Sequence, residues 1–417
     1  MLDINYIREN PDKVKEAAKN KNRVVDIDKI LELDNKRVEH IQKSQKLREE
    51  RNAFPKGKPD EKTIERGKQI KVELKTIEDE LAKIESEFKN LMLYVPNVPL
   101  DEVPIGKDPS GNKELKKWGD IPKFDFKPKD HITLGTELDI FDLERGSKIS
   151  GFRGYFLKNE GAILQVALLF YVFQKLTKKG YVPFIAPSIV KQFTLFGSGH
   201  FPWGSEQDVY KLNEDDRYLS GTAEIPITAY HSGEVLQEKD LPKKYVGFSS
   251  CFRKEAGAYG KDTKGLYRLH EFWKIEQVIV GKNDIDEARK IHEELEQNAE
   301  EILQDLKLPY RQLLMCTGDM GEPQLKKYDI ETWMPSRNAY GETMSNSIMG
   351  EFQSRRLNIR YKTRGGKTEY VYTFNNTAVA SPRILIAILE IYQQENGNVK
   401  IPEALQSLTG FSEIKRK

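Results

Sequence analysis

A strand–loop–strand segment in the middle of the chain carries residue types that can hold a nucleotide triphosphate. Residues 251–255 read CFRKE and residues 267–272 read YRLHEF, with a glycine-rich polar loop between them. Arg253 and Arg268 each offer several donors in one plane, which suits a phosphate or a carboxylate, and the Phe272 ring can stack on a base. The sequence has no GxxxxGK[ST] motif, so a P-loop is not the phosphate site.

Two further segments carry charged groups that need partners. Arg383 stands near the first turn of a predicted apolar helix, where the helix dipole disfavours a cation, so it predicts an anionic partner. Residues 222–224 read TAE, and Glu276 lies on the strand after the loop. Each has a simpler interpretation when taken alone: a surface ion pair for Arg383, a helix N-cap with a first-turn acid for TAE, and a half-exposed strand residue for Glu276.

The N-terminal part of the chain predicts a long helical hairpin at about residues 27–94. Apolar residues alternate there in steps of four and three, as in the seam of a coiled coil: Ile70, Leu74, Ile77, Leu81, Ile84, Phe88 and Leu91. Residues 54–60 read FPKGKPD, and their prolines and glycine break a helix and reverse the chain. We therefore expect two antiparallel helices of roughly 25 residues, about 35–40 Å long.

The distal half of this predicted hairpin is basic. Its cations include Lys36, Arg37, Lys43, Arg51 and Lys71. Glutamates are interspersed, and a charge-rich coiled coil of this kind is often only a solvated face or a dimerisation element. The alternative is an arm that grips RNA phosphates.

The rest of the chain predicts a second domain of the α+β class. Residues 94–130 hold many prolines and favour a linker that runs over the surface of the next domain. Beyond it, β-rich runs such as 244–252 and 269–280 do not alternate regularly with helices, which favours an antiparallel sheet flanked by helices. We expect an N-terminal domain at residues 1–110 and a catalytic domain at 111–417.

Composition narrows the class of protein. The chain has 417 residues and a net charge of +2, so overall charge does not identify a partner. The cysteines, Cys251 and Cys316, form no CxxC or Cys/His pattern, which argues against a zinc site and a disulfide framework and fits a reducing cytoplasm. The first residues are polar and no apolar run reaches membrane length, so we expect a soluble, cytoplasmic protein.

The segment around Arg253 resembles motif 2 of the class II aminoacyl-tRNA synthetases, and in its details the seryl-tRNA synthetase family of the bacterial type. The residues that carry this resemblance are 253–257 (RKEAG), 260–265 (GKDTKG), 268–270 (RLH) and Glu276. The segment GYVPFIAP at 180–187 and the strand and helix around Arg383 are similar to the other two motifs of that class. The three motifs are expected at about residues 165–187, 247–278 and 369–392.

The resemblance implies sites for L-serine and for ATP with Mg²⁺ in one pocket, with Arg253 and Arg383 as the catalytic residues. The L-serine site would include Thr222, Ala223, Glu224, Arg253, Glu276, Asn375 and Thr377. The ATP site would include Arg253, Lys254, Glu255, Arg268, Leu269, Phe272, Glu342, Thr343, Met344, Ser345 and Arg383. Glu342 and Ser345 would hold Mg²⁺, which prefers oxygen ligands, and no zinc is expected.

The resemblance also implies an activity and partners. Serine would be activated with ATP to seryl-adenylate and pyrophosphate, and then transferred to the 3′ end of tRNA(Ser) and also of tRNA(Sec). The basic hairpin would recognise the tRNA, while Lys261 and Lys264 of the motif 2 loop would face its acceptor end. Pro187 would lie at the interface of a homodimer, and no membrane partner is expected.

One segment departs from the family pattern. Residues 340–348 read YGETMSNSI, with Gly341 at the position of the usual arginine, Met344 at a serine and Ile348 at an asparagine. These changes leave open a catalytically silent paralogue that binds RNA. A class II-like ligase that passes its adenylate to a carrier protein is a second alternative, although such seryl-like proteins lack the long N-terminal arm.

Overall fold

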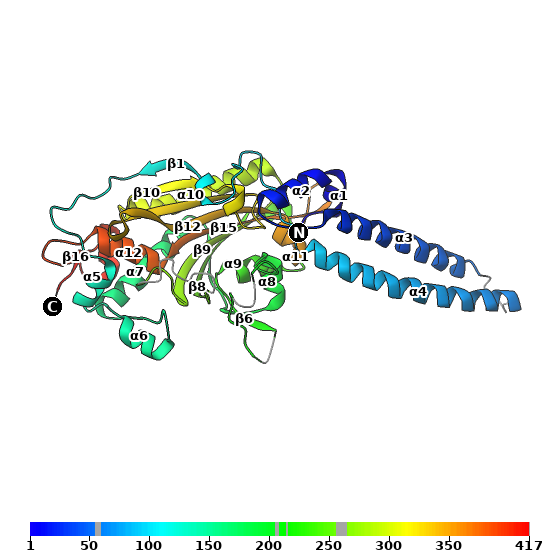
Figure 1. Cartoon of the computed structure of the whole chain (residues 1–417), viewed down its shortest axis with the longest axis horizontal. Coiled ribbons are helices and arrows are strands. Elements are labelled where there is room, and N and C mark those ends of the chain that lie inside the picture. The colour runs from blue at the N-terminus through cyan, green and yellow to red at the C-terminus, as the bar shows by residue number, and fades with distance from the viewer. Residues whose placement is uncertain (55–59, 205–207, 214–215, 256–264, 417) are drawn as a thin grey trace. The chain divides into compact units, whose positions relative to one another are not determined.

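Figure 1 shows the computed structural model of the chain, which describes residues 1–54, 60–204, 208–213, 216–255 and 265–416. The chain divides into two compact units, Met1–Val98 and Pro99–Lys417. Most of the predicted hairpin tip, and the loop residues Lys261 and Lys264, lie outside the described residues.

The first unit is a helical hairpin with two short helices at its base (Figure 1). Its helices are α1 (Ile4–Glu9), α2 (Pro11–Asn20), α3 (Ile27–Asn52) and α4 (Glu61–Met92). The Asp26 and Asp60 carboxylates accept hydrogen bonds from the backbone N–H groups of Lys29 and Thr63, which satisfies free donors where α3 and α4 begin. These helices have 26 and 32 residues, so the returning helix is longer than expected.

The predicted apolar stripe of α4 lies along its contact with α3. Ile70 and Leu74 are buried, and Leu81, Ile84 and Phe88 are half-buried. Polar pairs also join the two helices: His40 with Glu80, Arg48 with Glu78 and Glu50 with Arg66. The prediction of an antiparallel coiled-coil hairpin is therefore confirmed.

The second unit is built on an eight-stranded sheet with the order β1-β10-β11-β12-β15-β9-β8-β4. Its strands are β1 (Lys113–Trp118), β4 (Val182–Ile185), β8 (Lys243–Phe252), β9 (Glu271–Gly281), β10 (Tyr310–Leu314), β11 (Lys326–Met334), β12 (Ala339–Gly350) and β15 (Tyr372–Ala380). Neighbouring strands are antiparallel, except that the edge strand β4 runs parallel to β8. The predicted α+β class is confirmed.

Alternate residues of the central strand β9 face two different layers. Ile275 and Ile279 belong to the large core. The helices that contribute to that core include α7 (Asn159–Lys178), α10 (Ile285–Asp305) and α12 (Ser381–Ile391). Val278 and Val280 belong to a second core on the opposite face. The two-residue period of a strand thus separates a helix-covered face of the sheet from a face that is free to carry a site.

Smaller elements surround the sheet. The helices are α5 (His131–Glu137), α6 (Leu143–Ser150), α8 (Gln192–Ser198), α9 (Glu224–Thr228), α11 (Phe352–Leu357) and α13 (Glu403–Thr409), with short 3₁₀ turns that include η2 (Ala229–His231) and η5 (Pro335–Arg337). The short strands are β2 (Phe141–Asp142), β3 (Phe156–Leu157), β5 (Ile189–Lys191), β6 (Arg217–Leu219), β7 (Val235–Gln237), β13 (Arg360–Lys362), β14 (Thr368–Tyr370), β16 (Val399–Lys400) and β17 (Glu413–Ile414).

One strand lies in the proline-rich segment for which only a surface linker was expected. β1 pairs with the β10 edge of the sheet, and Trp118 stacks on Tyr310 with ring centroids 5.7 Å apart. The linker expectation was wrong here because every residue of β1 is exposed, so the strand has no apolar alternation to reveal it. Its backbone hydrogen bonds to β10 define it instead.

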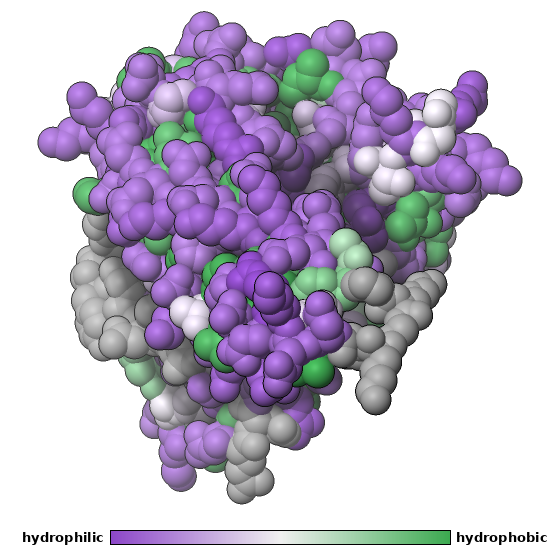
Figure 2. Space-filling model, turned by 90° about the vertical axis from the view of Figure 1, so that its right-hand side faces the viewer, coloured by the Kyte–Doolittle hydropathy of each residue, from purple (hydrophilic) through white to green (hydrophobic). Residues whose placement is uncertain are grey.

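The surface of the molecule is polar where Figure 2 shows it, with small and separate hydrophobic spots. Within the described ranges, no helix is both long enough and apolar enough to cross a membrane. Cys251 and Cys316 are buried and unpaired with each other.

Candidate active site

Several elements of the second unit converge on one pocket. β9 supplies Phe272, Lys274 and Glu276, which alternate along the strand and therefore face the same side. The neighbouring strand β15 places Thr377 opposite Glu276 in the ladder. The other walls come from the segment after β8, from α9, from β12 and from the first turn of α12, which carries Arg383.

Most side chains that the sequence assigned to the site line this pocket. They are Thr222, Glu224, Arg253, Glu255, Arg268, Leu269, Phe272, Glu276, Glu342, Thr343, Met344, Ser345, Asn375, Thr377 and Arg383. Two others point elsewhere: Ala223 is buried in the second core, and the Lys254 ammonium lies 5.6 Å from the centre of the Tyr210 ring. Pro187 is exposed just after β4.

At one end of the pocket, a buried lysine gathers acidic and hydroxyl groups. Lys274 Nζ lies 2.6 Å from Glu276 Oε2 and donates a hydrogen bond to Thr222 Oγ1 at 2.7 Å. The Thr377 hydroxyl donates to the same Glu276 oxygen at 3.1 Å. Because burying an unpaired charge is costly, the contact with Lys274 offsets part of the cost of burying the Glu276 carboxylate.

Lys274 is a site residue that the sequence analysis missed. It stands two residues before Glu276, and strand alternation alone puts both side chains on one face. Asn375, which the sequence did assign, is buried beside this cluster, and its Nδ2 has no hydrogen-bond partner in the described part of the chain. That amide group is therefore available to a ligand in the pocket.

Glu224 begins α9 and is the second carboxylate of this end. Gln353 Nε2 donates to its Oε1 at 2.7 Å. Burial raises the pKa of Glu224 to about 7, and the charge of Glu276 acts in the same direction. His200, which sequence reasoning left outside any site, also lines the pocket. Burial lowers the pKa of its imidazole to about 4, with Arg253 and Lys274 adding to the effect.

Arginines also line the pocket. The Arg253 guanidinium lies 5.3 Å from the centre of the Phe272 ring, and its Nε donates to Gly221 O at 3.3 Å. Arg268 Nη1 donates to Glu255 Oε2 at 2.9 Å. Planar guanidinium groups in these positions can bind phosphate oxygens from several sides.

Arg383 is held by contacts with two segments that are distant in the sequence. Its Nη1 donates to Glu342 O at 2.8 Å and to Glu342 Oε2 at 3.2 Å. Its Nε donates to Tyr267 O at 3.3 Å, and its guanidinium lies 4.5 Å from the centre of the Tyr267 ring. The orientation of Arg383 is thus set by these contacts before any anion binds.

Glu342 and Ser345 stand on β12, with Asp329 of β11 opposite Ser345 in the ladder. Lys327 Nζ donates to Asp329 Oδ2 at 2.9 Å, while burial keeps the pKa of Asp329 above its usual value. Burial opposes the charged form of Glu342, but nearby cations, Arg383 first among them, hold the pKa of Glu342 below its usual value. An ionised carboxylate beside a hydroxyl fits a hard cation.

This oxygen set does not make a complete metal site by itself. Among the described residues, no three or more His, Cys, Asp or Glu side chains form a group that could hold a metal ion. Glu342 and Ser345 therefore fit a cation whose remaining ligands come from phosphate oxygens and water, which is the usual situation of Mg²⁺ bound to a nucleotide.

The three departures from the family pattern have structural explanations. A Cβ atom at Gly341 would lie 3.1 Å from both Met334 Sδ and Tyr267 Oη, so these side chains occupy the space beside the glycine. Met344 and Ile348 are buried in the large core. The changes thus coincide with apolar packing around β12, whereas the carboxylate and the hydroxyl of Glu342 and Ser345 still line the pocket.

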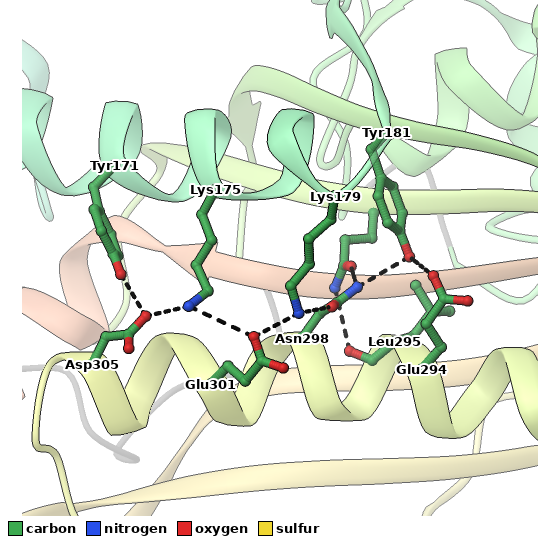
Figure 3. A network of polar contacts seen from close by, with 10 residues as sticks. Tyr171, Lys175, Lys179, Tyr181, Glu294, Leu295, Asn298, Glu301 and Asp305 are labelled. Carbon is green, nitrogen blue, oxygen red and sulfur yellow. Dashed lines mark hydrogen bonds and ion pairs between the residues drawn. The ribbon is translucent and has the colours of Figure 1, made fainter.

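A polar network on the opposite face of the sheet supports the strands of the site. Figure 3 shows side chains of α7 and α10 meeting along a line of hydrogen bonds and ion pairs, among them Lys179 with Asn298 and Glu301. Asn298 Nδ2 donates to Gln277 Oε1 at 2.8 Å, and Gln277 Nε2 donates to Asn376 Oδ1 at 2.7 Å. These buried amides lie in register on β9 and β15, so they favour the pairing that places Glu276 beside Thr377.

The geometry and the family models agree on the class of protein. Residues 208–392 match the model for the tRNA synthetase class II core domain (G, H, P, S and T). The arginines that line the pocket lie within these residues: Arg253 follows β8, Arg268 precedes β9 and Arg383 lies on α12. The second unit thus contains the core domain of a class II aminoacyl-tRNA synthetase, a ligase.

The comparisons over the full chain define the family. Residues 1–99 match the seryl-tRNA synthetase N-terminal domain. The chain is 44% identical to the serine--tRNA ligase of Deinococcus radiodurans, covering 99% of both chains, and 44% identical to that of Treponema denticola, covering 99% of this chain and 100% of the relative. The structure resembles seryl-tRNA synthetase from Pyrococcus horikoshii complexed with ATP, with a TM-score of 0.93, 38% identity and full coverage of both chains. The chain belongs to the seryl-tRNA synthetase family.

Proposed function

We propose that this chain activates L-serine with ATP to form seryl-adenylate and pyrophosphate, and then transfers serine to the 3′ end of tRNA(Ser). The observation that carries the proposal is the division of one pocket into two ends. Glu276, Lys274 and Thr222 form a small polar cluster at one end, with Arg253 bonded to Gly221 next to Thr222. Arg383 contacts Glu342 and Tyr267 at the other end. A zwitterionic amino acid with one hydroxyl group suits the first end, and a triphosphate suits the second.

The polar cluster would select serine. Glu224 and Thr222 would receive its ammonium group, and Glu276 and Thr377 would receive its hydroxyl group. An analogue without the hydroxyl would lose the hydrogen bonds to Glu276 and Thr377, which lowers affinity. Asn375 offers a further donor from the β15 side.

The chemistry needs positioning more than acid–base catalysis. The serine carboxylate is already ionised at neutral pH and can attack the α-phosphorus directly. Arg253 would hold that carboxylate beside the α-phosphate, and Arg383 would stabilise the charge that develops on the leaving phosphates. Mg²⁺ on the nucleotide, held by Glu342 and Ser345, would supply further positive charge there.

The N-terminal hairpin would bind the tRNA. Lys36 and Lys43 pair with Glu32 and Glu39 of the same helix, and Arg37 pairs with the buried Asp34, so part of their charge is neutralised within the hairpin. Arg51 and Lys71 are exposed. Exposed cations on such an arm favour contact with the phosphate backbone. tRNA(Sec) is included as a second substrate, and charging of the two transcripts separately tests it.

The activity can be tested by ATP–pyrophosphate exchange with each of the twenty amino acids, in Mg²⁺ and without tRNA. Exchange with serine alone supports both the adenylation step and the assignment of the pocket. Exchange with alanine at a similar rate would contradict the selective role of Glu276, and exchange with threonine at a similar rate would contradict serine as the substrate. A chain that exchanges with no amino acid but binds tRNA would be the silent paralogue instead.

The raised pKa of Glu224 predicts how serine activation depends on pH. With a pKa of about 7, Glu224 is mostly protonated at pH 6 and mostly ionised at pH 8. Only the ionised carboxylate attracts an ammonium group, so kcat/KM for serine should rise about tenfold from pH 6 to pH 8. Exchange rates at limiting serine measure this rise, and kcat/KM for ATP over the same range is the reference.

A substitution of Gln353, whose side-chain amide contacts Glu224, gives a second test of this pH dependence. Gln353 donates to Glu224 and so stabilises its charged form. Gln353→Met should move the midpoint of the serine profile to higher pH. A serine profile that is flat from pH 6 to pH 8, or that only follows the ATP profile, would contradict the role given to Glu224.

We further propose that two copies of the chain form a homodimer through the first motif. Ile163, Val166 and Phe170 are exposed along one side of α7, and the edge strand β4 exposes Val182 and Ile185. α7 packs against β4, so these side chains belong to one region of the second unit. An apolar surface on an unpaired sheet edge is typical of an interface between copies.

The oligomeric state in solution tests this surface. Ile185→Asp puts a charge on the exposed sheet edge and should convert a dimer into a monomer in light scattering coupled to gel filtration. Val24→Asp is the matched control, because Val24 is also an exposed apolar residue but lies in the first unit. A wild-type chain that is monomeric at micromolar concentration would contradict the proposal.

A further inference from the structure

The carboxylate of Glu390, on α12, accepts several hydrogen bonds outside the pocket. Glu390 of α12 is fully buried. Its Oε1 accepts from the backbone N–H of His131 at 3.0 Å and lies 2.8 Å from His131 Nδ1. Both the N–H and the hydroxyl of Ser336 also donate to Glu390, at 2.9 and 2.8 Å. The carboxylate therefore ties α5 and η5 to the end of α12.

The second nitrogen of the His131 ring continues this chain of contacts. His131 Nε2 lies 3.2 Å from the backbone nitrogen of Leu266, and an amide N–H can only donate. The hydrogen bonds therefore assign the tautomer: Nε2 is unprotonated and accepts from Leu266, while Nδ1 carries the proton and donates to Glu390. In this tautomer, His131 accepts a hydrogen bond from the Leu266 amide and donates one to the Glu390 carboxylate.

The anchored amide stands at the start of the pocket wall. Leu266, Tyr267 and Arg268 line the pocket in sequence. The carbonyl oxygen of Tyr267 accepts a hydrogen bond from Arg383 Nε, and the Tyr267 ring lies under the Arg383 guanidinium. A shift of the Leu266 backbone would therefore move the group that orients Arg383.

The two residues that hold the Leu266–Arg268 segment, Arg383 and Glu390, both belong to α12. Arg383 and Glu390 are seven residues apart on α12, which is about two turns, so they lie on one face of the helix. Arg383 contacts Tyr267 directly, and Glu390 contacts Leu266 through His131. The wall segment is thus fixed to α12 at two successive residues.

The residue before Leu266 shows how closely the ring and the backbone are packed. Gly265 has a φ of +67°, a conformation that favours glycine. A Cβ atom on Gly265 would lie only 2.1 Å from His131 Nε2. The glycine therefore admits both the backbone turn and the imidazole ring.

We propose that His131, oriented by Glu390, is a positioning residue for the ATP end of the pocket. It fixes the Leu266–Arg268 backbone, and through Tyr267 it fixes the orientation of Arg383. The proposal rests on the proposed function, since it takes the arginine end of the pocket as the triphosphate site. His131 has no proposed role at the serine end, where Lys274 is the partner of Glu276 and Thr222.

The test is a comparison of KM values for ATP and for serine in pyrophosphate exchange. His131→Leu removes both ring nitrogens and leaves the Leu266 N–H without its acceptor, so KM for ATP should rise about tenfold. KM for serine should stay within about twofold of the wild-type value, because the serine end keeps its contacts. His131→Gln keeps an acceptor and a donor, and should recover most of the loss in KM for ATP.

A second buried histidine provides the matched control. His231 of η2 also contacts a carboxylate, Glu234, at 2.7 Å, and a hydroxyl group, Tyr245 Oη, at 2.6 Å. It does not line the pocket that the structure describes. His231→Leu should lower thermal stability as His131→Leu does, with no selective change in KM for ATP.

The outcomes separate this proposal from the proposed function. A wild-type chain without serine-dependent exchange would overturn the function itself. With exchange present, equal changes in both KM values for His131→Leu, or no recovery in His131→Gln, would overturn the positioning role. Should His131→Leu fail to fold, Gly265→Ala displaces Leu266 from the intact ring and should give the same selective rise in KM for ATP; an unchanged ratio would overturn the proposal.

Discussion

Arg383→Ala is expected to lower the rate of serine-dependent ATP–pyrophosphate exchange by about 1000-fold, in line with the loss of a charged donor from a preorganised site. Arg383 Nη1 bonds to Glu342 at 2.8 and 3.2 Å, so the guanidinium is aimed at the oxygen-rich wall before substrate arrives. Alanine removes the charge that would stabilise the leaving pyrophosphate, and it leaves Glu342 without its strongest nearby cation. Exchange at saturating serine and ATP measures the effect.

A second arginine that contacts the same ring is the control for this variant. Arg337 lies 4.5 Å from the centre of the Tyr267 ring but is not among the described residues that line the pocket. Arg337→Ala should therefore change exchange by no more than about twofold. Affinity for tRNA, measured by filter binding, should survive in both variants. Exchange that stays near the wild-type rate in Arg383→Ala would show that the pocket is wrongly assigned.

Removal of the hairpin is expected to have the opposite effect. His40 and Glu80 contact each other across the two helices, with Nε2 and Oε2 3.0 Å apart. A variant that lacks residues 41–79 and joins these two through a short glycine turn cuts both helices at the same level. The base of the unit keeps its core, including Ile7, Ile27 and Met92. Aminoacylation of tRNA should fall at least about 100-fold through lost phosphate contacts, while pyrophosphate exchange stays within about twofold.

Charge reversal distinguishes an RNA-binding arm from a merely structural one. Arg51→Glu combined with Lys71→Glu alters exposed positions and leaves the helical seam intact. If the arm binds phosphates, this variant should weaken tRNA binding and reduce its dependence on salt concentration. Aminoacylation at the wild-type rate by the shortened chain would contradict a role of the hairpin in tRNA recognition and would favour a solvated or dimerising element.

Several of the site residues that sequence analysis predicted stand in locally recognisable positions. Arg253, Arg268 and Glu276 stand on a hairpin whose local spacing is short, and Arg383 stands at a helix start where a cation needs a partner. Such positions can be recognised because both the chemistry and the geometry depend on residues that are near in sequence. The same holds for the hairpin, whose apolar period predicted the buried positions Ile70 and Leu74.

The residues that were missed depend on contacts between distant segments. Lys274 gains its role from Thr222, which lies 52 positions away in the sequence. His131 meets Leu266 at a separation of 135 and Glu390 at 259. β1 was missed for a related reason, since its side chains are exposed and only its pairing with β10 makes it a strand.

The sequence by itself therefore determined the hairpin, the α+β class, the family and most of the pocket, because periodicity and motif spacing are local properties of the chain. Only the tertiary structure decided which charged groups of the pocket are paired and how burial shifts their pKa values. It placed Lys274 beside Glu276, it buried Glu224 until its pKa rose to about 7, and it packed Gly341 against Tyr267. Burial and charge pairing arise from strands and helices brought together in space, and no spacing along the chain encodes them directly.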